Sequence, residues 1–288
     1  MPAPQRARLS RPELVATLRS GSQARLILIS APAAAGKTTL LASWHADATA
    51  TVRLVVSRRS RNDPVRFWGY VLASLRTVHP ELGPAVDGAL RAAGSDVTEL
   101  ALPLLVNALA EVADPLVLVL DDYHEIENAD VHQSMEFLID HLPGAVQVAI
   151  ASRSDPPLGL ARVRAWAERL EVGVKDLRLG VEEATALLNG SLGLGLEPDQ
   201  VTRLREGTEG WAAGLQLVGL WLQGMADPSG YIASFAGDDR QILDYLAAEV
   251  LDHQTPELRA FLLGSSILEG SRVHCATRSC SGTGPPGC

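Results

Sequence analysis

Short apolar runs alternate with helix-like segments through the first 180 residues of the chain. Five runs have the length and composition of buried strands: 25–30, 52–57, 116–120, 145–152 and 169–174. Segments between them, such as 65–78, 97–113 and 131–142, carry apolar residues at helical spacing. Strands that alternate with helices, each strand almost wholly apolar, are typical of a parallel sheet covered on both faces. The pattern therefore predicts an α/β fold with a five-stranded parallel sheet.

Two local patterns refine this prediction at the ends of elements. Ser10 and Glu13 have the spacing of a capping box, and with Pro12 in the first turn they predict a short helix that ends at Arg19. Residues 80–96 are rich in Gly and Ala and are expected to form a loop.

Beyond Gly180 the helical spacing continues, but no convincing strand follows. We expect a first domain over 1–180, a helical domain over 181–238 and the start of another small unit over 239–268. The final segment, 269–288, has Val273 and Ala276 as its only aliphatic residues. Because so little apolar surface cannot offset the entropy of ordering, this tail is expected to be disordered.

Composition narrows the class of protein. Of the 288 residues, 47% are hydrophobic, which suffices for a globular core, and the net charge of −9 gives no overall electrostatic footprint for nucleic acid. No run reaches the ~18 apolar residues of a membrane span. Residues 1–274 contain no cysteine. We therefore expect a cytoplasmic protein without disulfides and without a membrane partner.

The first apolar run leads directly into a motif with known chemistry. Residues 31–38 read Ala-Pro-Ala-Ala-Ala-Gly-Lys-Thr, which matches G-x-x-x-x-G-K-[ST] except at its first position. In such a loop, successive backbone N–H groups and the following helix N-terminus hold phosphates, while Thr38 would bind Mg²⁺. The candidate nucleotide-binding residues are Ala31, Ala33, Ala34, Ala35, Gly36, Lys37, Thr38 and Thr39.

Two features of this loop stand out. The chain has 23 Arg but only two Lys, and one of the two is Lys37, whose compact ammonium can reach the β- and γ-phosphates. Ala34 and Ala35 occupy positions where a positive φ would strain an alanine by roughly 1–2 kcal/mol.

Two further strand ends carry candidate catalytic groups. The run 116–120 closes with Asp121 and Asp122, as in a Walker B strand, so that Asp121 would hold Mg²⁺ and Asp122 would polarise an attacking water. Arg153 follows the run 145–152 and could contact the γ-phosphate. His124 is equally consistent with a local hydrogen bond and with catalysis. A metal site at His274, Cys275 and Cys280 is disfavoured because these residues lie in the tail.

Several motifs in order carry a family resemblance. They are "RPEL" from Arg11, "SAPAAAGKTTLLASW", "NDPVRFWGYVLASL", "LVLVLDDYHEI", "ASRSDPPLGLARVRAW", "TEGWAAGLQL" and "LDYLAAEVLDHQTPELRAFLL". Over residues 6–268 the chain resembles the N-terminal half of MalT-like, large ATP-binding LuxR-type transcription regulators, which are STAND-class ATPases. The resemblance implies a P-loop NTPase domain, a helical domain and, over 239–268, part of a winged-helix domain.

The resemblance also implies roles and partners. The strand ending at Ser152 would lie between those ending at Ser30 and Leu120, and Arg11 and Pro12 would lie near the adenine. The cofactors would be ATP or ADP with Mg²⁺, bound by a slow ATPase switch that self-associates or acts on a partner regulator. The family-like pattern stops at Leu268, so this chain is expected not to recognise specific DNA itself.

The chain departs from the family pattern in three respects, one of which is the expected absence of the sensor and helix-turn-helix regions. The family usually has Gly and an aromatic residue at Ala34 and Ala35, and an acidic stretch where this chain has the basic residues of 57–64. Two alternatives to a regulatory ATPase stay open: a phosphotransferase acting on a small substrate, and a scaffold that binds nucleotide without turnover.

Overall fold

The computed structural model describes residues 11–21, 24–47, 51–55, 63–93, 96–159, 169–225 and 227–235. All of them belong to the first of two units into which the chain divides, Met1–Gly237. The predicted winged-helix part, the predicted disordered tail and the basic stretch 57–62 lie outside the described residues.

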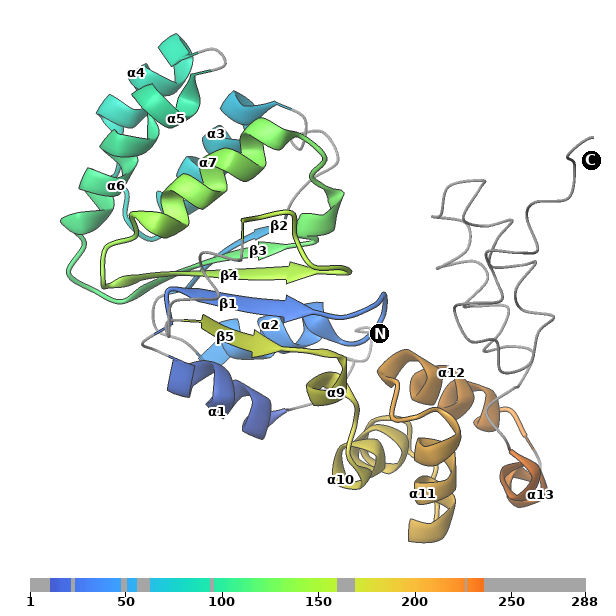
Figure 1. Ribbon diagram of the computed structural model, residues 1–288. Coiled ribbons are helices and arrows are strands. Elements are labelled where there is room, and N and C mark those ends of the chain that lie inside the picture. The colour runs from blue at the N-terminus through green and yellow to red at the C-terminus, as the bar shows by residue number, and fades with distance from the viewer. Residues whose placement is uncertain are drawn as a thin grey trace, which may run out of the picture. The chain divides into compact units, whose positions relative to one another are not determined.

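Five parallel strands form one sheet in the order β2-β3-β4-β1-β5 (Figure 1). The strands are β1 (Leu26–Ser30), β2 (Thr51–Val55), β3 (Leu116–Asp121), β4 (Val146–Ser152) and β5 (Arg169–Val172). Strand β4 pairs with β1, where Ser152 lies opposite Ser30, and with β3, where Ile150 lies opposite Leu120. The prediction that the strand ending at Ser152 separates the other two is therefore confirmed.

Helices cover both faces of this sheet (Figure 1). They include α1 (Pro12–Ser20), α2 (Lys37–Asp47), α3 (Pro64–Leu75), α4 (Pro84–Ala93), α5 (Val97–Leu100), α6 (Leu102–Ala110) and α7 (Ala129–Asp140). Alternate residues of β1 point to opposite faces, as the pleat requires. Leu26 and Leu28 pack with α3–α7, whereas Ile27 and Ile29 pack with α1 and α2.

Two local predictions are corrected by the structure. Arg11, and not Ser10, is the N-cap of α1, and no side chain caps this helix. Residues 84–93, expected to lie in a loop, form α4. Val86 and Leu90 are one helical turn apart, and both are buried in the core cluster that α3 also joins. That burial outweighs the low helix propensity of the nearby glycine.

The described part of 181–238 consists of helices and contains no strand. A short helix α9 (Val174–Leu177) precedes it, and α10 (Val181–Thr185) leads into a π-helical turn η3 (Ala186–Ser191). The remaining helices are α11 (Pro198–Gly207), α12 (Ala212–Leu222) and α13 (Pro228–Ser234). A domain boundary at Gly180 stays a prediction, because both sides of it belong to the same unit.

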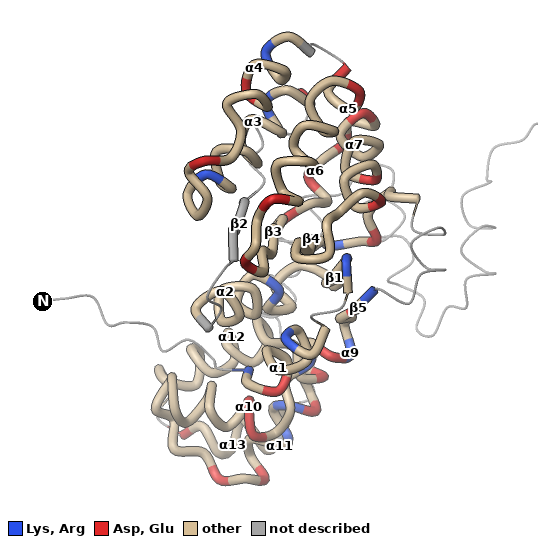
Figure 2. The backbone as a smooth tube through the Cα atoms, turned by 90° about the vertical axis from the view of Figure 1, so that its left-hand side faces the viewer, with Lys and Arg blue, Asp and Glu red and all other residues tan. Residues whose placement is uncertain are grey.

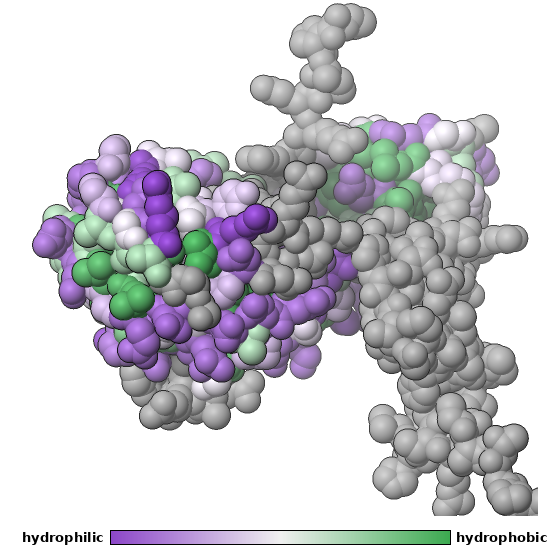
Figure 3. Space-filling model, turned by 90° about the horizontal axis from the view of Figure 1, so that it is seen from above, coloured by the Kyte–Doolittle hydropathy of each residue, from purple (hydrophilic) through white to green (hydrophobic). Residues whose placement is uncertain are grey.

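Charged residues of both signs are distributed along the described elements (Figure 2). On the face shown in Figure 3, the coloured residues form small hydrophobic patches bordered by hydrophilic ones, as on ordinary solvent-exposed helices. Among the described helices, none combines the length and the apolar character that a membrane crossing requires.

Candidate functional site

The loop between β1 and α2 spans residues 31–36. Its start is tied to the neighbouring strand, since the Ala31 N–H donates to the Ser152 carbonyl at 3.2 Å. Gly36 has a φ of 93°, and a Cβ built there would meet only the Cβ of Ala212, at 4.0 Å. Backbone conformation, and not crowding, therefore requires glycine at this position.

Ala34 adopts the left-handed conformation, with a φ of 57°. Glycine takes this conformation without a Cβ penalty, whereas an alanine pays about 1–2 kcal/mol. Ala35 is not in this region. The strain anticipated from the sequence is therefore confirmed at Ala34 and does not occur at Ala35.

Lys37 is folded back onto the loop that precedes it. Its side chain is buried, and Nζ donates to the carbonyls of Ala31 at 2.6 Å and Pro32 at 2.8 Å. Burial, reinforced by the Arg153 charge, lowers the pKa of Lys37, while Asp122 and Asp121 act in the opposite direction. An anionic ligand beside this ammonium would favour its charged form and strengthen ligand binding.

Thr38 and Asp121 come together from separate parts of the chain. The Thr38 hydroxyl donates to Asp121 Oδ2 at 2.9 Å, across a sequence separation of 83 residues. The other carboxylate oxygen of Asp121 accepts from the Asp122 N–H at 3.1 Å. A hydroxyl beside a carboxylate, next to a phosphate-type loop, is the oxygen donor set that Mg²⁺ prefers. These residues therefore fit the predicted metal.

The chain turns sharply directly after Asp121. Asp122 is left-handed, with φ 57° and ψ 38°, a conformation that Asp tolerates better than most residues. The next residue, Tyr123, begins the short helix η2 (Tyr123–Glu125) and places its hydroxyl 3.0 Å from His132 Nδ1 on α7. Both side chains are buried. This pair anchors the turn that presents Asp122.

The end of β4 adds polar groups to the same edge of the sheet. Ser152 is fully buried, and its hydroxyl lacks a hydrogen-bond partner within the described structure. Both ring nitrogens of His124 also lack one, although Glu125 Oε1 lies 3.7 Å from Nε2. Burial and then the Arg153 charge lower the pKa of His124, against the opposing charges of Asp122 and Glu125. Arg153 thus lies close enough to Lys37 and His124 to act on both.

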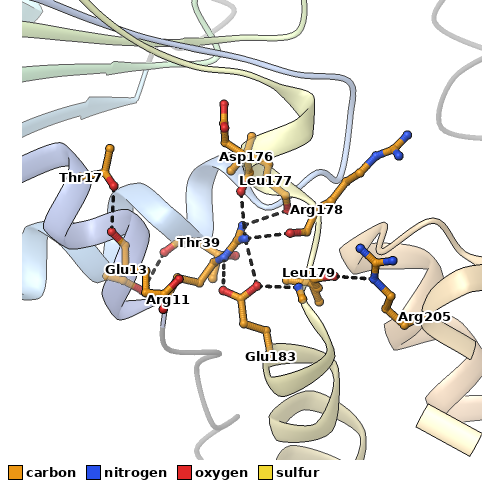
Figure 4. A network of polar contacts seen from close by, with 12 residues as sticks. Arg11, Glu13, Thr17, Thr39, Asp176, Leu177, Arg178, Leu179, Glu183 and Arg205 are labelled. Atoms are coloured by element: carbon orange, nitrogen blue, oxygen red, sulfur yellow. Dashed lines mark hydrogen bonds and ion pairs between the residues drawn. The ribbon is translucent and has the colours of Figure 1, made fainter. Parts of the chain in front are cut away.

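The Arg11 side chain has hydrogen-bond partners within the protein, which Figure 4 shows. Its guanidinium is buried and bonds to Glu183 and to the carbonyls of 176–178. Pro12 is the exposed first residue of α1, and Thr39 is exposed in the first turn of α2. Contacts of Arg11, Pro12 and Thr39 with a nucleotide remain predictions.

Sequence reasoning missed Tyr123, His132 and Ser152. The available signals were the tyrosine directly after the acidic pair and a histidine on the apolar face of α7. No group of three or more His, Cys, Asp or Glu side chains within the described ranges could hold a metal by itself. The candidate ligands of the tail, His274, Cys275 and Cys280, lie outside those ranges.

Comparison with known proteins points to the same loop chemistry. Residues 4–150 match the family model described as AAA ATPase domain. The serine/threonine-protein kinase PknK of Mycobacterium tuberculosis (strain ATCC 25618 / H37Rv) is 34% identical over 264 residues, covering 91% of this chain and 24% of that protein. The HTH-type transcriptional regulator MalT of Serratia proteamaculans is 35% identical over 263 residues, covering 90% of this chain and 29% of MalT.

The chain thus corresponds to 24% and 29% of the lengths of these two curated relatives. Among solved structures, the Walker-type ATPase PABY2304 of Pyrococcus abyssi is similar, with a TM-score of 0.60 at 14% sequence identity. The match covers 99% of this chain and 89% of that one. At this identity the likeness supports the fold.

Proposed function

Because the chain belongs to the AAA ATPase domain family, we propose that it is a nucleotide-dependent switch that binds ATP or ADP with Mg²⁺ and hydrolyses ATP slowly. The observation that carries the proposal is the 2.9 Å contact between the Thr38 hydroxyl and the Asp121 carboxylate beside the Lys37 loop. Through this contact, the phosphate-binding loop and the acidic end of β3 form one site for phosphate and metal.

The chain's own residues divide the work as follows. The backbone N–H groups of 33–36 and the ammonium of Lys37 hold the phosphates, and Thr38 and Asp121 supply oxygen ligands to Mg²⁺. The metal, when bound, neutralises phosphate charge. Asp122 orients and deprotonates the attacking water, and Arg153 pairs with the terminal phosphate.

The relatives favour a regulatory role for this activity. One is named a protein kinase and the other a transcriptional regulator, yet both contain a segment like this chain. A segment shared by proteins with different outputs is better suited to switching than to either output. We include self-association or contact with a partner regulator in the proposal as the means by which the switch is read.

Replacing Asp122 separates binding from turnover. Asp122→Asn should retain Mg²⁺-ADP binding, because Asp121 and Thr38 remain, but slow hydrolysis by about 10²-fold or more, because the amide cannot accept the proton of the water. Calorimetry and a single-turnover phosphate-release assay measure the two effects. Asp130→Asn, at the exposed start of α7, is the matched control.

Equal hydrolysis by Asp122→Asn and the parent would remove Asp122 from catalysis. A parent chain that binds nucleotide but releases no phosphate would instead identify a scaffold without turnover. Transfer of the phosphate to a molecule other than water would identify a phosphotransferase.

A further inference from the structure

The buried guanidinium of Arg11 contacts a single segment of the chain (Figure 4). Nε donates to Glu183 Oε1 at 2.8 Å, and a terminal nitrogen donates to the Leu177 carbonyl at 3.0 Å. The other terminal nitrogen lies 3.2 Å from the carbonyls of Asp176 and Arg178, and 3.2 Å from Glu183 Oε2. Only 4% of the Arg11 side chain is exposed.

These partners all belong to the passage from the sheet to the helical region. The carbonyls of 176–178 lie at the end of α9 and directly after it, and Glu183 lies in α10. Arg11 itself occupies the N-cap position of α1, whose Val15 and Leu18 pack in the same core cluster as Leu177. A planar guanidinium reaches several acceptors in a fixed geometry, which a lysine ammonium cannot reproduce. Arg11 therefore fixes the path of residues 176–183, here called the linker, against α1.

The linker is fixed in turn to the start of α12. The Leu179 N–H donates to the Gly210 carbonyl at 2.8 Å, and Arg205 Nε donates to the Leu179 carbonyl at 3.1 Å. Gly210 has a φ of 70°, and a Cβ there would lie 2.7 Å from the Leu179 oxygen. The linker and the turn before α12 thus fit together only with glycine at this position.

Helix α12 begins beside the loop that precedes α2. A Cβ placed on Gly36 would lie 4.0 Å from the Cβ of Ala212, the first residue of α12. Hydrogen bonds therefore connect Arg11 to residues 176–183, and connect these residues to the Gly210 turn. That turn places Ala212 beside Gly36.

We propose that Arg11 is a latch that holds the start of α12 against the nucleotide loop. While Arg11 stays bound to Glu183 and the linker carbonyls, the linker keeps its position. The first turn of α12 then stays beside the loop of residues 31–36. Release of Arg11 lets the helical region move and opens the loop. The consequence for nucleotide exchange rests on the proposed nucleotide binding, whereas the latch itself does not.

Hydrogen exchange of the nucleotide-free chain tests the latch directly. Arg11→Ala, Arg11→Lys and Glu183→Gln should each exchange faster than the parent, by roughly tenfold or more, in segments 176–183 and 209–214, while strands β1, β3 and β4 keep their protection. Arg91→Ala, which removes an arginine from an exposed ion pair with Asp87, is the matched control and should match the parent. Glu183→Gln keeps the test informative should Arg11→Ala fail to fold.

Dissociation of a fluorescent ADP analogue tests the link to the loop. Glu183→Gln should release it about tenfold faster than the parent and Arg91→Ala, although Glu183 is not a predicted nucleotide ligand. Unchanged exchange in both segments would overturn the latch, and faster exchange with unchanged ADP dissociation would overturn its control of the loop. If the parent binds no ADP, the proposed function fails, and the exchange data alone decide the latch.

Discussion

The loop before α2 uses alanine at a position where glycine would be easier to accommodate. Ala34 is left-handed, with a φ of 57°. Ala34→Gly should raise the free energy of unfolding by about 0.5–1 kcal/mol, because relief of about 1–2 kcal/mol of strain exceeds the added entropy of the unfolded glycine. Urea unfolding of the two proteins measures the difference.

The neighbouring alanines provide the control for this prediction. Ala33 and Ala35 do not have a positive φ, so glycine at either position relieves nothing. Ala33→Gly and Ala35→Gly should therefore lower the free energy of unfolding, by about 0.5–1 kcal/mol each. A loss of the same size for Ala34→Gly would show that its backbone is unstrained.

The buried pair of Tyr123 and His132 predicts a pH dependence. Burial lowers the pKa of His132 below 6.5. Between this folded-state pKa and pH 6.5, the unfolded chain therefore binds a proton that the folded chain does not. The free energy of unfolding should then rise with pH up to about 6.5. The destabilisation is complete below the folded-state pKa and disappears above 6.5.

Unfolding measured at about pH 5 and about pH 8 in His132→Asn tests this pH dependence. The variant should show a smaller difference between the two conditions than the parent. The difference should not vanish, because the pKa of His124 is also lowered. The control is His45→Asn, at an exposed position, which should leave the difference between the two pH values unchanged. A His132→Asn protein with the parent's full pH dependence would contradict the assignment.

At the scale of single residues, the sequence predicted those site residues that a local motif brings together. Lys37, Thr38 and Asp121 meet because a strand, a loop and a helix follow one another at set spacing, and a second strand ends beside them. Tyr123 and His132 could not be paired in advance, because their contact depends on how α7 packs on the sheet. The partners of Arg11 were equally hidden, since they lie 165–172 residues away.

At the scale of elements, the strands were easier to predict than α4. Strands β1, β3 and β4 are short apolar runs that are buried on both faces, so composition alone identifies them. Helix α4 is rich in Ala and contains Gly88, and composition suggested a loop. The signal that composition obscured was the spacing of Val86 and Leu90. Arg76 on the preceding turn also bonds Asp87, at 3.1 Å.

The joint between the linker and α12 predicts a strong effect of a single methyl group. Gly210→Ala should lower the free energy of unfolding by about 1–3 kcal/mol, because alanine is strained at a φ of 70° and its Cβ would meet the Leu179 carbonyl oxygen. Thermal or urea unfolding gives the value.

Gly190→Ala is the matched control within the same helical region. A Cβ at Gly190 would meet nothing within 4 Å, and the residue is helical, so alanine should be neutral or stabilising by about 0.5–1 kcal/mol. Equal effects of the two substitutions would mean that the Gly210 turn does not constrain the linker.

At the scale of the whole molecule, the site is a product of sheet topology. Strands β3, β4 and β1 are neighbours and parallel, so their carboxyl ends meet at one edge. Asp121, Asp122, Arg153 and the Lys37 loop all lie at that edge. Ligands of open parallel sheets bind at such edges. The strand order was predictable from the resemblance, whereas the path of the helical region over the loop was not, because long-range contacts such as those of Arg11 determine it.

The proposed switch depends on the binding of nucleotide by the Lys37 loop. Its most direct test is calorimetric titration of the chain with ADP and Mg²⁺, comparing the parent with Lys37→Ala and Lys175→Ala. The two lysines are the only ones in the chain, and Lys175 is exposed on α9. The parent and Lys175→Ala should bind with equal affinity, and Lys37→Ala should bind at least about tenfold more weakly, because a charge-assisted contact to phosphate is lost. Equal affinity of all three folded proteins, or no binding by the parent, would contradict nucleotide binding by the Lys37 loop.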